Sequence, residues 1–504
     1  MDQPIRSAHA RRRLHAGAAL LLGALVIGPV IAAGAQTAAS WSQALGGPAH
    51  GGYAADAPAP PYREAWSLDV SGDGPTSPFG ASPPVVSGST VLTVTPRTIV
   101  AADVGSGAQQ WIVAKDYGPP VSPAVADAGK RQLLLFTEGF GDSPPGASPT
   151  PSAGSGSSPS SAPTTNGPTD SHLTAIDLAT HEPVWKTPLQ LKGVSRTGVT
   201  VAGGTAYVGD NRGNVYAVDA ASGALRWTVS VGGFLTTPLA ATDDLVIAVV
   251  QADRSVPPRV VTLKASDGSQ AWSADASASA AFATAPAIDG DHVIVGFSDG
   301  TIRAFAISDG SEVWTARMNA PVFFTGAPAV APEAVVAVDS LGQVYRLDPG
   351  TGARVWDFAL NRSVLRGAPV VAGGSVLVAS GDGRLAAIDL ASGKLVWESQ
   401  ATDVILRSLT LTPDVVIAVR GGSRGGLVGY VTDPSGSLTS IVSPTVLNLP
   451  LLVGAFLVAA LPLGAVLILG GRAMRLRMGP AFIEDETGVA DPWEPDGSDD
   501  EVDG

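Results

Sequence analysis

The sequence predicts an all-β fold: an eight-bladed β-propeller that is closed by a strand from its N-terminal part and flanked on both sides by an apolar helix. Three observations predict it. Tryptophan recurs at a nearly constant spacing, a pair of extended segments recurs with it, and two long uncharged segments lie near the chain ends. Glycine (60) and proline (40) are abundant among the 504 residues, which suits short strands joined by turns.

The spacing of tryptophan gives the length of the repeat. Successive tryptophans are 41 to 45 residues apart, except for one interval of 74 residues. That interval contains residues 141–171, a run of Pro, Ser, Gly and Thr that we interpret as a loop inserted into one repeat. The repeat tryptophans are Trp66, Trp111, Trp185, Trp227, Trp272, Trp314, Trp356 and Trp397.

Each repeat also contains an extended segment that predicts two strands around a turn, as in APAIDGDHVIVGF from Ala285. There are eight such segments, and the last, at residues 409–420, has no tryptophan after it. Trp66, conversely, precedes the first segment. We therefore expect the strand around Trp66 to complete the last blade, which leaves no open sheet edge.

A strand, a turn and a tryptophan end most repeats, as in VYAVDAASGALRW. We expect the aspartate to accept hydrogen bonds from turn amides, the glycine to adopt a positive φ, and the indole ring to pack between neighbouring sheets. Two repeats depart from the pattern, with Lys264 and Ala306 at the aspartate position. Besides the tryptophans, the candidate docking residues are Asp103, Asp177, Asp219, Asp348, Asp389, Gly107, Gly223, Gly352 and Gly393.

This A-x-D-x-x-[ST]-G-x-x-x-W pattern resembles the tryptophan-docking motif of pyrroloquinoline-quinone-type (PQQ-type) propeller repeats, over about residues 41–433. The segment from Trp41 to Trp66 is similar to the lead-in of such proteins. The resemblance implies a possible quinone cofactor in the central funnel, with a calcium or lanthanide ion, an aspartate base and often a disulfide. The chain has no cysteine and no long structured insertion, so we expect neither pyrroloquinoline quinone nor calcium as a cofactor.

The resemblance also extends to the propeller of the outer-membrane assembly lipoprotein, which binds protein partners and no quinone. Our leading hypothesis is a non-catalytic scaffold with protein partners at the propeller faces, in envelope assembly or sensing. The alternatives are a quinone- or metal-dependent dehydrogenase and a polysaccharide-binding module, for which the aromatic pair Phe323 and Phe324 gives thin support. A net charge of −14 argues against nucleic acid as a partner.

Two apolar segments predict a cell-membrane location. Residues 16–36 follow a basic cluster, and residues 446–469 precede one, so the basic ends should stay cytoplasmic and the propeller should be exported. The first segment is either a retained anchor or a signal peptide cut near Ala35. The predicted parts are a basic stub with the signal or anchor helix (1–40), the propeller (41–440), a transmembrane helix (446–470) and an acidic, disordered cytoplasmic tail (471–504).

Other candidate sites have ordinary structural interpretations. The four recurring acids could ring one face and bind a cation, but hairpin turns favour Asp-Gly sequences without any function. The six histidines lack metal-ligand spacing, and we expect them in solvated turns or on the surface. Residues 421–425 match a nucleophile-elbow motif but precede a strand-like segment, so we interpret them as a turn. The four acids are Asp210, Asp299, Asp339 and Asp382.

Overall fold

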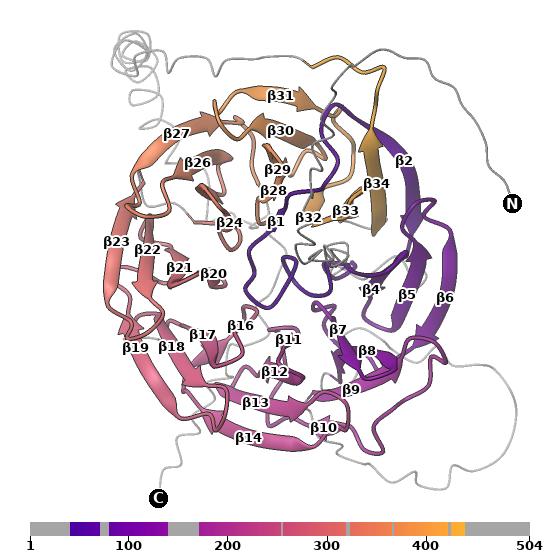
Figure 1. Cartoon of the computed structure of the whole chain (residues 1–504), viewed down its shortest axis with the longest axis vertical. Helices are drawn as coiled ribbons and strands as arrows, with labels where there is room; N and C mark the ends of the chain where they lie inside the picture. The colour runs from indigo at the N-terminus through magenta and orange to yellow at the C-terminus, as the bar shows by residue number, and fades with distance from the viewer. Residues whose placement is uncertain are drawn as a thin grey trace, which may run out of the picture. The chain divides into compact units, whose positions relative to one another are not determined.

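The structure, a computed structural model, describes residues 41–70, 80–139, 171–253, 256–318, 323–364, 367–421 and 425–438. These residues form a ring of eight four- or five-stranded sheets around a central axis (Figure 1). None of the described residues is helical, so no described helix could span a membrane. The prediction of an all-β, eight-bladed propeller is therefore confirmed. The two predicted membrane segments, the acidic tail and nearly all of the predicted insertion lie outside the described residues.

The strands of one repeat follow chain order from the axis to the rim, and hydrogen-bonded neighbours among them are antiparallel. A short strand from the N-terminal part of the chain, which pairs with the seventh blade, is parallel to its neighbour. The first blade consists of β3 (Val85–Ser87), β4 (Thr90–Val94), β5 (Thr98–Asp103) and β6 (Gln109–Ala114), and the second consists of β7 (Ala124–Ala128), β8 (Arg131–Glu138), β9 (His172–Asp177) and β10 (Leu189–Gln190). The third blade consists of β11 (Thr200–Ala202), β12 (Thr205–Gly209), β13 (Asn214–Asp219) and β14 (Leu225–Ser230). The fourth blade consists of β15 (Phe234–Leu235), β16 (Ala240–Ala241), β17 (Leu245–Gln251), β18 (Arg259–Lys264) and β19 (Gln270–Asp275).

The other four blades complete the ring, and two of them contain a strand from the N-terminal part of the chain. The fifth blade consists of β20 (Ala287–Asp289), β21 (His292–Phe297), β22 (Thr301–Ala306) and β23 (Glu312–Arg317), and the sixth consists of β24 (Ala329–Ala331), β25 (Ala334–Val338), β26 (Gln343–Leu347) and β27 (Arg354–Ala359). The seventh blade consists of β28 (Val370–Ala372), β29 (Ser375–Ala379), β30 (Leu385–Asp389) and β31 (Leu395–Glu398), with β1 (Tyr53–Ala54) beside β28. The eighth blade consists of β32 (Leu406–Leu411), β33 (Val416–Arg420), β34 (Gly426–Thr432) and β2 (Tyr62–Asp69).

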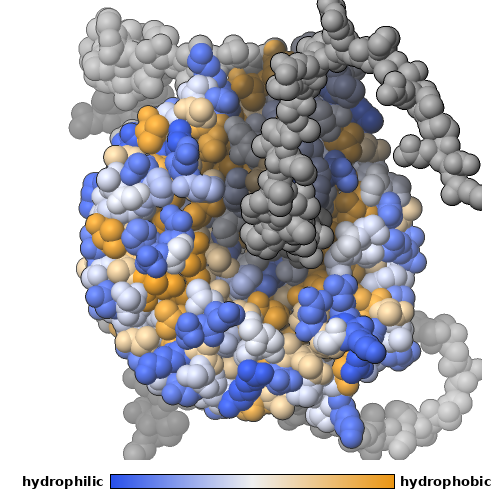
Figure 2. Space-filling view, in the orientation of Figure 1, coloured by the Kyte–Doolittle hydropathy of each residue, from blue (hydrophilic) through white to orange (hydrophobic). Residues whose placement is uncertain are grey.

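Burial explains the residue pattern of each blade. The second strands are aliphatic at nearly every position because both of their faces pack against neighbouring blades; every residue of β12 and β25 is buried. The outermost strands alternate instead: in β14 the buried residue is Trp227, between exposed neighbours. In Figure 2, hydrophilic residues are frequent at the rim of the ring, and hydrophobic residues gather in patches between the rim and the centre.

The ring closes as predicted. The N-terminal strand β2 pairs antiparallel with β34, from Tyr62 opposite Thr432 to Asp69 opposite Gly426. In Figure 1 the indigo β2 lies beside the yellow β34, although they come from opposite ends of the propeller sequence. This pairing joins the first and last parts of the ring and removes two open sheet edges.

The lead-in segment, residues 41–54, lies inside the ring (β1 in Figure 1). It contacts the innermost strand of seven blades in chain order, which satisfies edge amides that would otherwise be buried without partners. In the third blade the contact is made by the Gln43 side chain, which bonds both backbone groups of Val201. The backbone contacts are Val86 N to Trp41 O, Val125 N to Ser42 O, Ala241 N to Pro48 O, Ile288 N to Ala49 O, Val330 N to Gly51 O and Val371 N to Gly52 O.

Candidate functional site

A cavity of about 370 Å³ lies on the axis of the propeller, at the face where the innermost strands begin. Trp41, Ala44 and Leu45 of the lead-in segment also line it. Because that segment contacts the innermost strands further along their length, it closes the inner end of the cavity. The cavity is therefore a blind funnel. All eight blades contribute to its wall, through Pro83, Ser122, Thr197, Thr237, Thr284, Thr325, Ala368 and Leu409 among others.

The hydroxyl groups of the wall mostly serve the blades themselves. The Oγ1 atoms of Thr197 and Thr284 accept hydrogen bonds from the amides of Gly209 and Gly296, each at 3.0 Å. The Oγ1 atom of Thr237 is buried and has no hydrogen-bond partner. The hydroxyls of Thr197 and Thr284 thus join the segment before the first strand of a blade to its second strand.

The chemistry of the wall does not fit a metal-assisted quinone site. The described lining residues include no Asp, Glu, Asn or Gln, the side chains that would hold a calcium or lanthanide ion. Their one charged member is Arg196, which is exposed and whose guanidinium has no partner among the described residues. The lining is otherwise mainly apolar, with Trp41 and Phe324 as its aromatic members.

The recurring turn acids bind their own hairpins and do not line the funnel. Asp210 accepts hydrogen bonds from the amide of Arg212 and from the hydroxyl of Tyr216, both at 2.9 Å. Asp339 accepts equivalent bonds from the amide of Leu341 and the hydroxyl of Tyr345. Burial and the adjacent carboxylate raise the pKa of Tyr345, so this phenol stays a neutral donor.

Asp299 is held by its own hairpin and by the connection that precedes its blade. Its carboxylate accepts a hydrogen bond from the Ser277 hydroxyl, and a second from Thr301 Oγ1 at 2.6 Å. Arg303 Nη2 lies 3.4 Å from its other oxygen. The carboxylates of these three acids are thus already occupied by hydrogen bonds within their own blades and connections.

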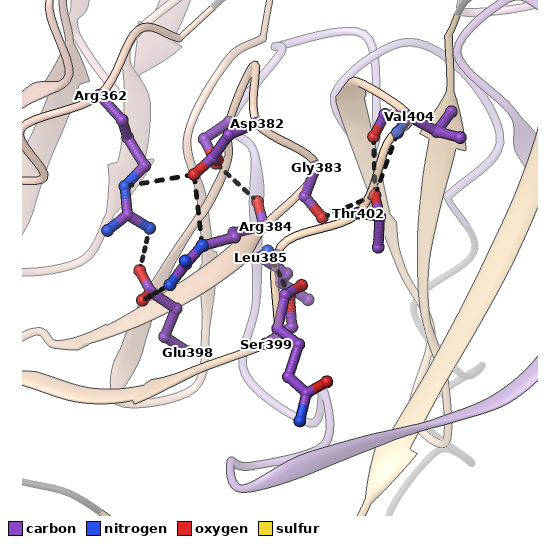
Figure 3. Close-up of polar contacts among 11 residues, drawn as sticks. Arg362, Asp382, Gly383, Arg384, Leu385, Glu398, Ser399, Thr402 and Val404 are labelled. Carbon is purple, nitrogen blue, oxygen red and sulfur yellow. Dashed lines mark hydrogen bonds and ion pairs between the residues drawn. The ribbon is translucent and has the colours of Figure 1, made fainter.

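Asp382, the fourth acid, belongs to an ion-pair network beside β31 (Figure 3). Arg384 places Nε 3.2 Å from Asp382 Oδ2 and Nη1 2.7 Å from Glu398 Oε2. Arg362, from the connection between β27 and β28, bonds the other oxygen of Glu398 and lies 3.9 Å from Asp382. The network has no net charge, and it ties that connection to the next blade. Since its members are partly exposed, each pair contributes little stability.

The repeat tryptophans join neighbouring blades. In six of them the indole Nε1 donates a hydrogen bond to a backbone carbonyl of the next blade, at 2.8 to 3.2 Å. The acceptor follows the aspartate position of the turn motif, and the ring packs on the glycine position of the same turn. The pairs are Trp66 with Val104, Trp185 with Ala220, Trp227 with Ala265, Trp272 with Ile307, Trp314 with Pro349 and Trp356 with Leu390.

The turn aspartates hold the docking platform in shape. One oxygen of each accepts hydrogen bonds from the amide and the hydroxyl of a Ser or Thr three residues further on. The Arg226 and Ser222 side chains lower the pKa of Asp219 to about 2. The bonded pairs are Asp103 with Ser106, Asp219 with Ser222, Asp348 with Thr351 and Asp389 with Ser392.

The two departing repeats keep this turn with a relocated acid. Asp267 and Asp309, each directly before the turn glycine, accept the amide hydrogen bonds of Ser269 and Ser311. Sequence reasoning missed this substitution, although the tetrapeptide Ser-Asp-Gly-Ser occurs in both turns and could have revealed it. The acid moves, but the turn that receives the indole ring is preserved.

Two tryptophans are docked differently and are only partly buried. The ring of Trp111 stacks on His181 with centroids 4.4 Å apart, and His181 adopts the positive φ of 63° that glycine adopts elsewhere. Trp397 meets the edge of Tyr62, from the closing strand, at 5.2 Å. Asp177, in the turn before His181, caps the amide of Ala179 at 2.8 Å.

The expectation of solvated histidines is wrong for His50. It lies in the lead-in segment and is fully buried; its Nδ1 donates to Pro286 O at 3.2 Å, and its Nε2 has no partner. Burial lowers the pKa of His50 to about 4, so the ring is neutral near pH 7. No sequence signal beyond its place in a Gly-rich stretch marked this histidine.

Asp116, Glu138 and His172 are the one group of three potential metal ligands among the described residues. His172 and Glu138 face each other across β8 and β9, with Nε2 and Oε1 3.1 Å apart. This hydrogen bond accounts for their proximity, and Asp116 is largely exposed. Residues 421–425, which match a nucleophile-elbow motif and which we interpret as a turn, are followed by β34 rather than by a helix; residues 422–424 lie outside the described residues.

Comparison with known proteins agrees with this architecture. BamB from Moraxella catarrhalis is 14% identical with a TM-score of 0.52, covering 74% of this chain and 100% of its own. The computationally designed Ika8 protein is 16% identical with a TM-score of 0.54, covering 73% and 100%. Quinohemoprotein alcohol dehydrogenase ADHIIG from Pseudomonas putida HK5 is 12% identical with a TM-score of 0.54, covering 84% and 85%. At these identities the likeness shows the fold alone.

No curated protein matches the sequence. The family model described as outer membrane protein assembly factor BamB matches residues 169–340 and 340–434, more than half of the chain. The matched stretch contains six of the eight repeat tryptophans and ends with β34, the partner of the closing strand. The PQQ-type repeats expected from the turn motif are thus confirmed, and the chain belongs to the family of the outer membrane protein assembly factor BamB.

Proposed function

We propose that this protein is a membrane-anchored, non-catalytic scaffold whose propeller binds protein partners outside the cytoplasm, in envelope assembly or sensing. The observation that carries the proposal is the blind funnel: the lead-in segment occupies the axis, and the described wall lacks the carboxylates and amides of a metal-assisted cofactor site. The family's description as an assembly factor points in the same direction.

A dehydrogenase is the second candidate, and the fold similarity to a quinohemoprotein is what favours it. That similarity concerns the propeller scaffold, which hosts unrelated functions. The described funnel wall lacks the ligand set that such chemistry would use.

Affinity capture from membranes tests the scaffold. The full chain and a chain lacking residues 480–504 would be crosslinked in cells of the source organism and purified, and the captured proteins would be compared. We expect a reproducible partner of the exported propeller with both chains, and an additional partner only if the acidic tail contacts one. No partner with either chain would contradict the proposal.

A further inference from the structure

Four large apolar side chains are exposed in the fourth, fifth and sixth blades, one in strand β15 and three in connections between strands, and we call them the apolar crescent. They are Phe234, Phe282, Phe323 and Leu341, with exposed fractions of 45%, 59%, 56% and 70%. Large apolar side chains gathered on one face of a soluble domain indicate an interaction surface.

Contacts given by the structure show that the crescent is continuous. The rings of Phe282 and Phe323 have centroids 6.2 Å apart. Phe323 O accepts a 2.8 Å hydrogen bond from the amide of Ser340, the neighbour of Leu341. At the other end Phe234 pairs with Gln251, whose side chain bonds both backbone groups of the residue after Phe282.

The crescent continues into the funnel. The residues directly after Phe282 and Phe323, namely Ala283 and Phe324, line the cavity. An apolar surface thus runs from the three blades into the wall of the funnel. Arg196, which is exposed, is the one charged residue of the described lining, and its guanidinium has no partner among the described residues. The surface therefore matches a ligand with an apolar body and one anionic group.

The shape of the site favours a chain end over a passing segment. The lead-in segment closes the funnel, so a polypeptide can enter it but not thread through it. A volume of about 370 Å³ is at the small end of ligand pockets and suits a few side chains rather than a folded element. A free α-carboxylate at the end of a polypeptide supplies an anionic partner for the guanidinium of Arg196.

We propose that the crescent and the funnel bind the apolar C-terminal segment of a partner protein. Its last side chains occupy the funnel, its α-carboxylate pairs with Arg196, and its preceding side chains cover Phe282 and Phe323. This proposal rests on the scaffold function, because it assigns the partner's site.

The probe is a fluorescent octapeptide whose last four residues alternate valine and phenylalanine, prepared as a free acid and as an amide. Binding to the full chain in lipid nanodiscs is measured by anisotropy, with empty nanodiscs as the blank. The acid should bind saturably and the amide about tenfold more weakly or worse, as expected for loss of a charge-assisted hydrogen bond. Arg196→Gln should lower the affinity for the acid to that for the amide.

Variants of the crescent and matched controls complete the test. Phe282→Ser combined with Phe323→Ser should weaken both peptides by about tenfold, because both lose apolar contacts. Val313→Ser combined with Val355→Ser is the control, since these valines are 44% and 51% exposed on outer strands of the fifth and sixth blades. Lys192→Gln is the charge control, because Lys192 is exposed and does not line the funnel.

Four outcomes would overturn the proposal. Equal affinity for acid and amide would show that no carboxylate is recognised. Binding to empty nanodiscs alone would make lipid the occupant, and self-association abolished by the crescent variant would make it a second copy of this chain. Partner capture that persists in the crescent variant would leave the scaffold function standing and remove only this site.

Discussion

The indole Nε1 of Trp314 donates a 2.8 Å hydrogen bond to the backbone carbonyl of Pro349, a residue of the following blade. The ring packs on Gly352 of the same turn and is 6% exposed. Each such tryptophan combines buried aromatic area with a satisfied N–H, so one side chain both packs and orients two sheets. The ring of blades is held together largely by this repeated contact.

Trp314→Ala should therefore lower the free energy of unfolding by about 3–5 kcal/mol, the usual range for a large aromatic replaced by alanine in a core. Denaturant titration of the purified protein measures this. Val313→Ala is the matched control: Val313 is the adjacent residue and is 44% exposed, so its loss should change stability little. Equal midpoints for both variants would mean that the ring is not docked.

Gly310 and Gly204 separate the effect of docking from that of backbone conformation. Both have positive φ, at 76° and 69°, so alanine at either position should cost about 1–2 kcal/mol. At Gly310 an added Cβ would also lie 2.5 Å from Cε3 of Trp272, whereas at Gly204 it meets nothing within 4 Å. We expect Gly310→Ala to be the more destabilising by a further amount of about 1–3 kcal/mol. Equal melting temperatures would contradict this packing.

Much of the fold could be predicted because the same pattern of strands, turn and tryptophan recurs along the propeller sequence. The interval between Trp227 and Trp272, for example, already contains two predicted strands, a turn and a docking residue. The pairing of β2 with β34 also followed from the sequence. Trp66 precedes the first predicted pair of strands, and the last predicted pair, at residues 409–420, has no tryptophan after it, so the strand around Trp66 supplies what the last blade lacks. Repetition makes local signals reliable even where single strands are short.

The candidate site could not be predicted in the same way. The lead-in segment has almost no regular secondary structure, and its place on the axis depends on single backbone contacts such as that between Trp41 and Val86. The crescent is also invisible in the sequence, since Phe234, Phe282 and Phe323 are far apart along the chain and become neighbours only when the blades are stacked around the axis. Both features arise from tertiary arrangement rather than local pattern.

The lead-in segment should contribute directly to stability. Gln43 is 3% exposed and bonds Val201 O at 2.9 Å and Val201 N at 2.7 Å. Gln43→Ala should cost about 1–3 kcal/mol, because it leaves buried backbone groups without partners. Gln110→Ala, on the exposed side of β6, is the control. If thermal unfolding does not distinguish the two variants, the segment does not occupy the axis.

His50 predicts a specific acid sensitivity. Burial lowers its pKa in the folded state from 6.5 to about 4, so the unfolded chain binds a proton more readily between these values. Stability should fall as pH decreases from about 6.5 to about 4, by about 3 kcal/mol in total, and this component should not change further below pH 4.

His50→Asn is the matching variant because asparagine tolerates the positive φ of 56° at this position. The unfolding free energies of both proteins would be measured at pH 7 and at about pH 4.5. We expect the wild-type protein to lose more stability than the variant. An identical loss in both would show that His50 is solvated.

The most direct test of a non-catalytic scaffold is calorimetric titration of the full chain with pyrroloquinoline quinone in the presence of calcium. The account predicts no heat beyond dilution and no shift in melting temperature, because the described funnel wall offers no carboxylate or amide to the ion and the lead-in segment closes its inner end. Saturable binding in the micromolar range or tighter would contradict it and would direct attention to an enzyme.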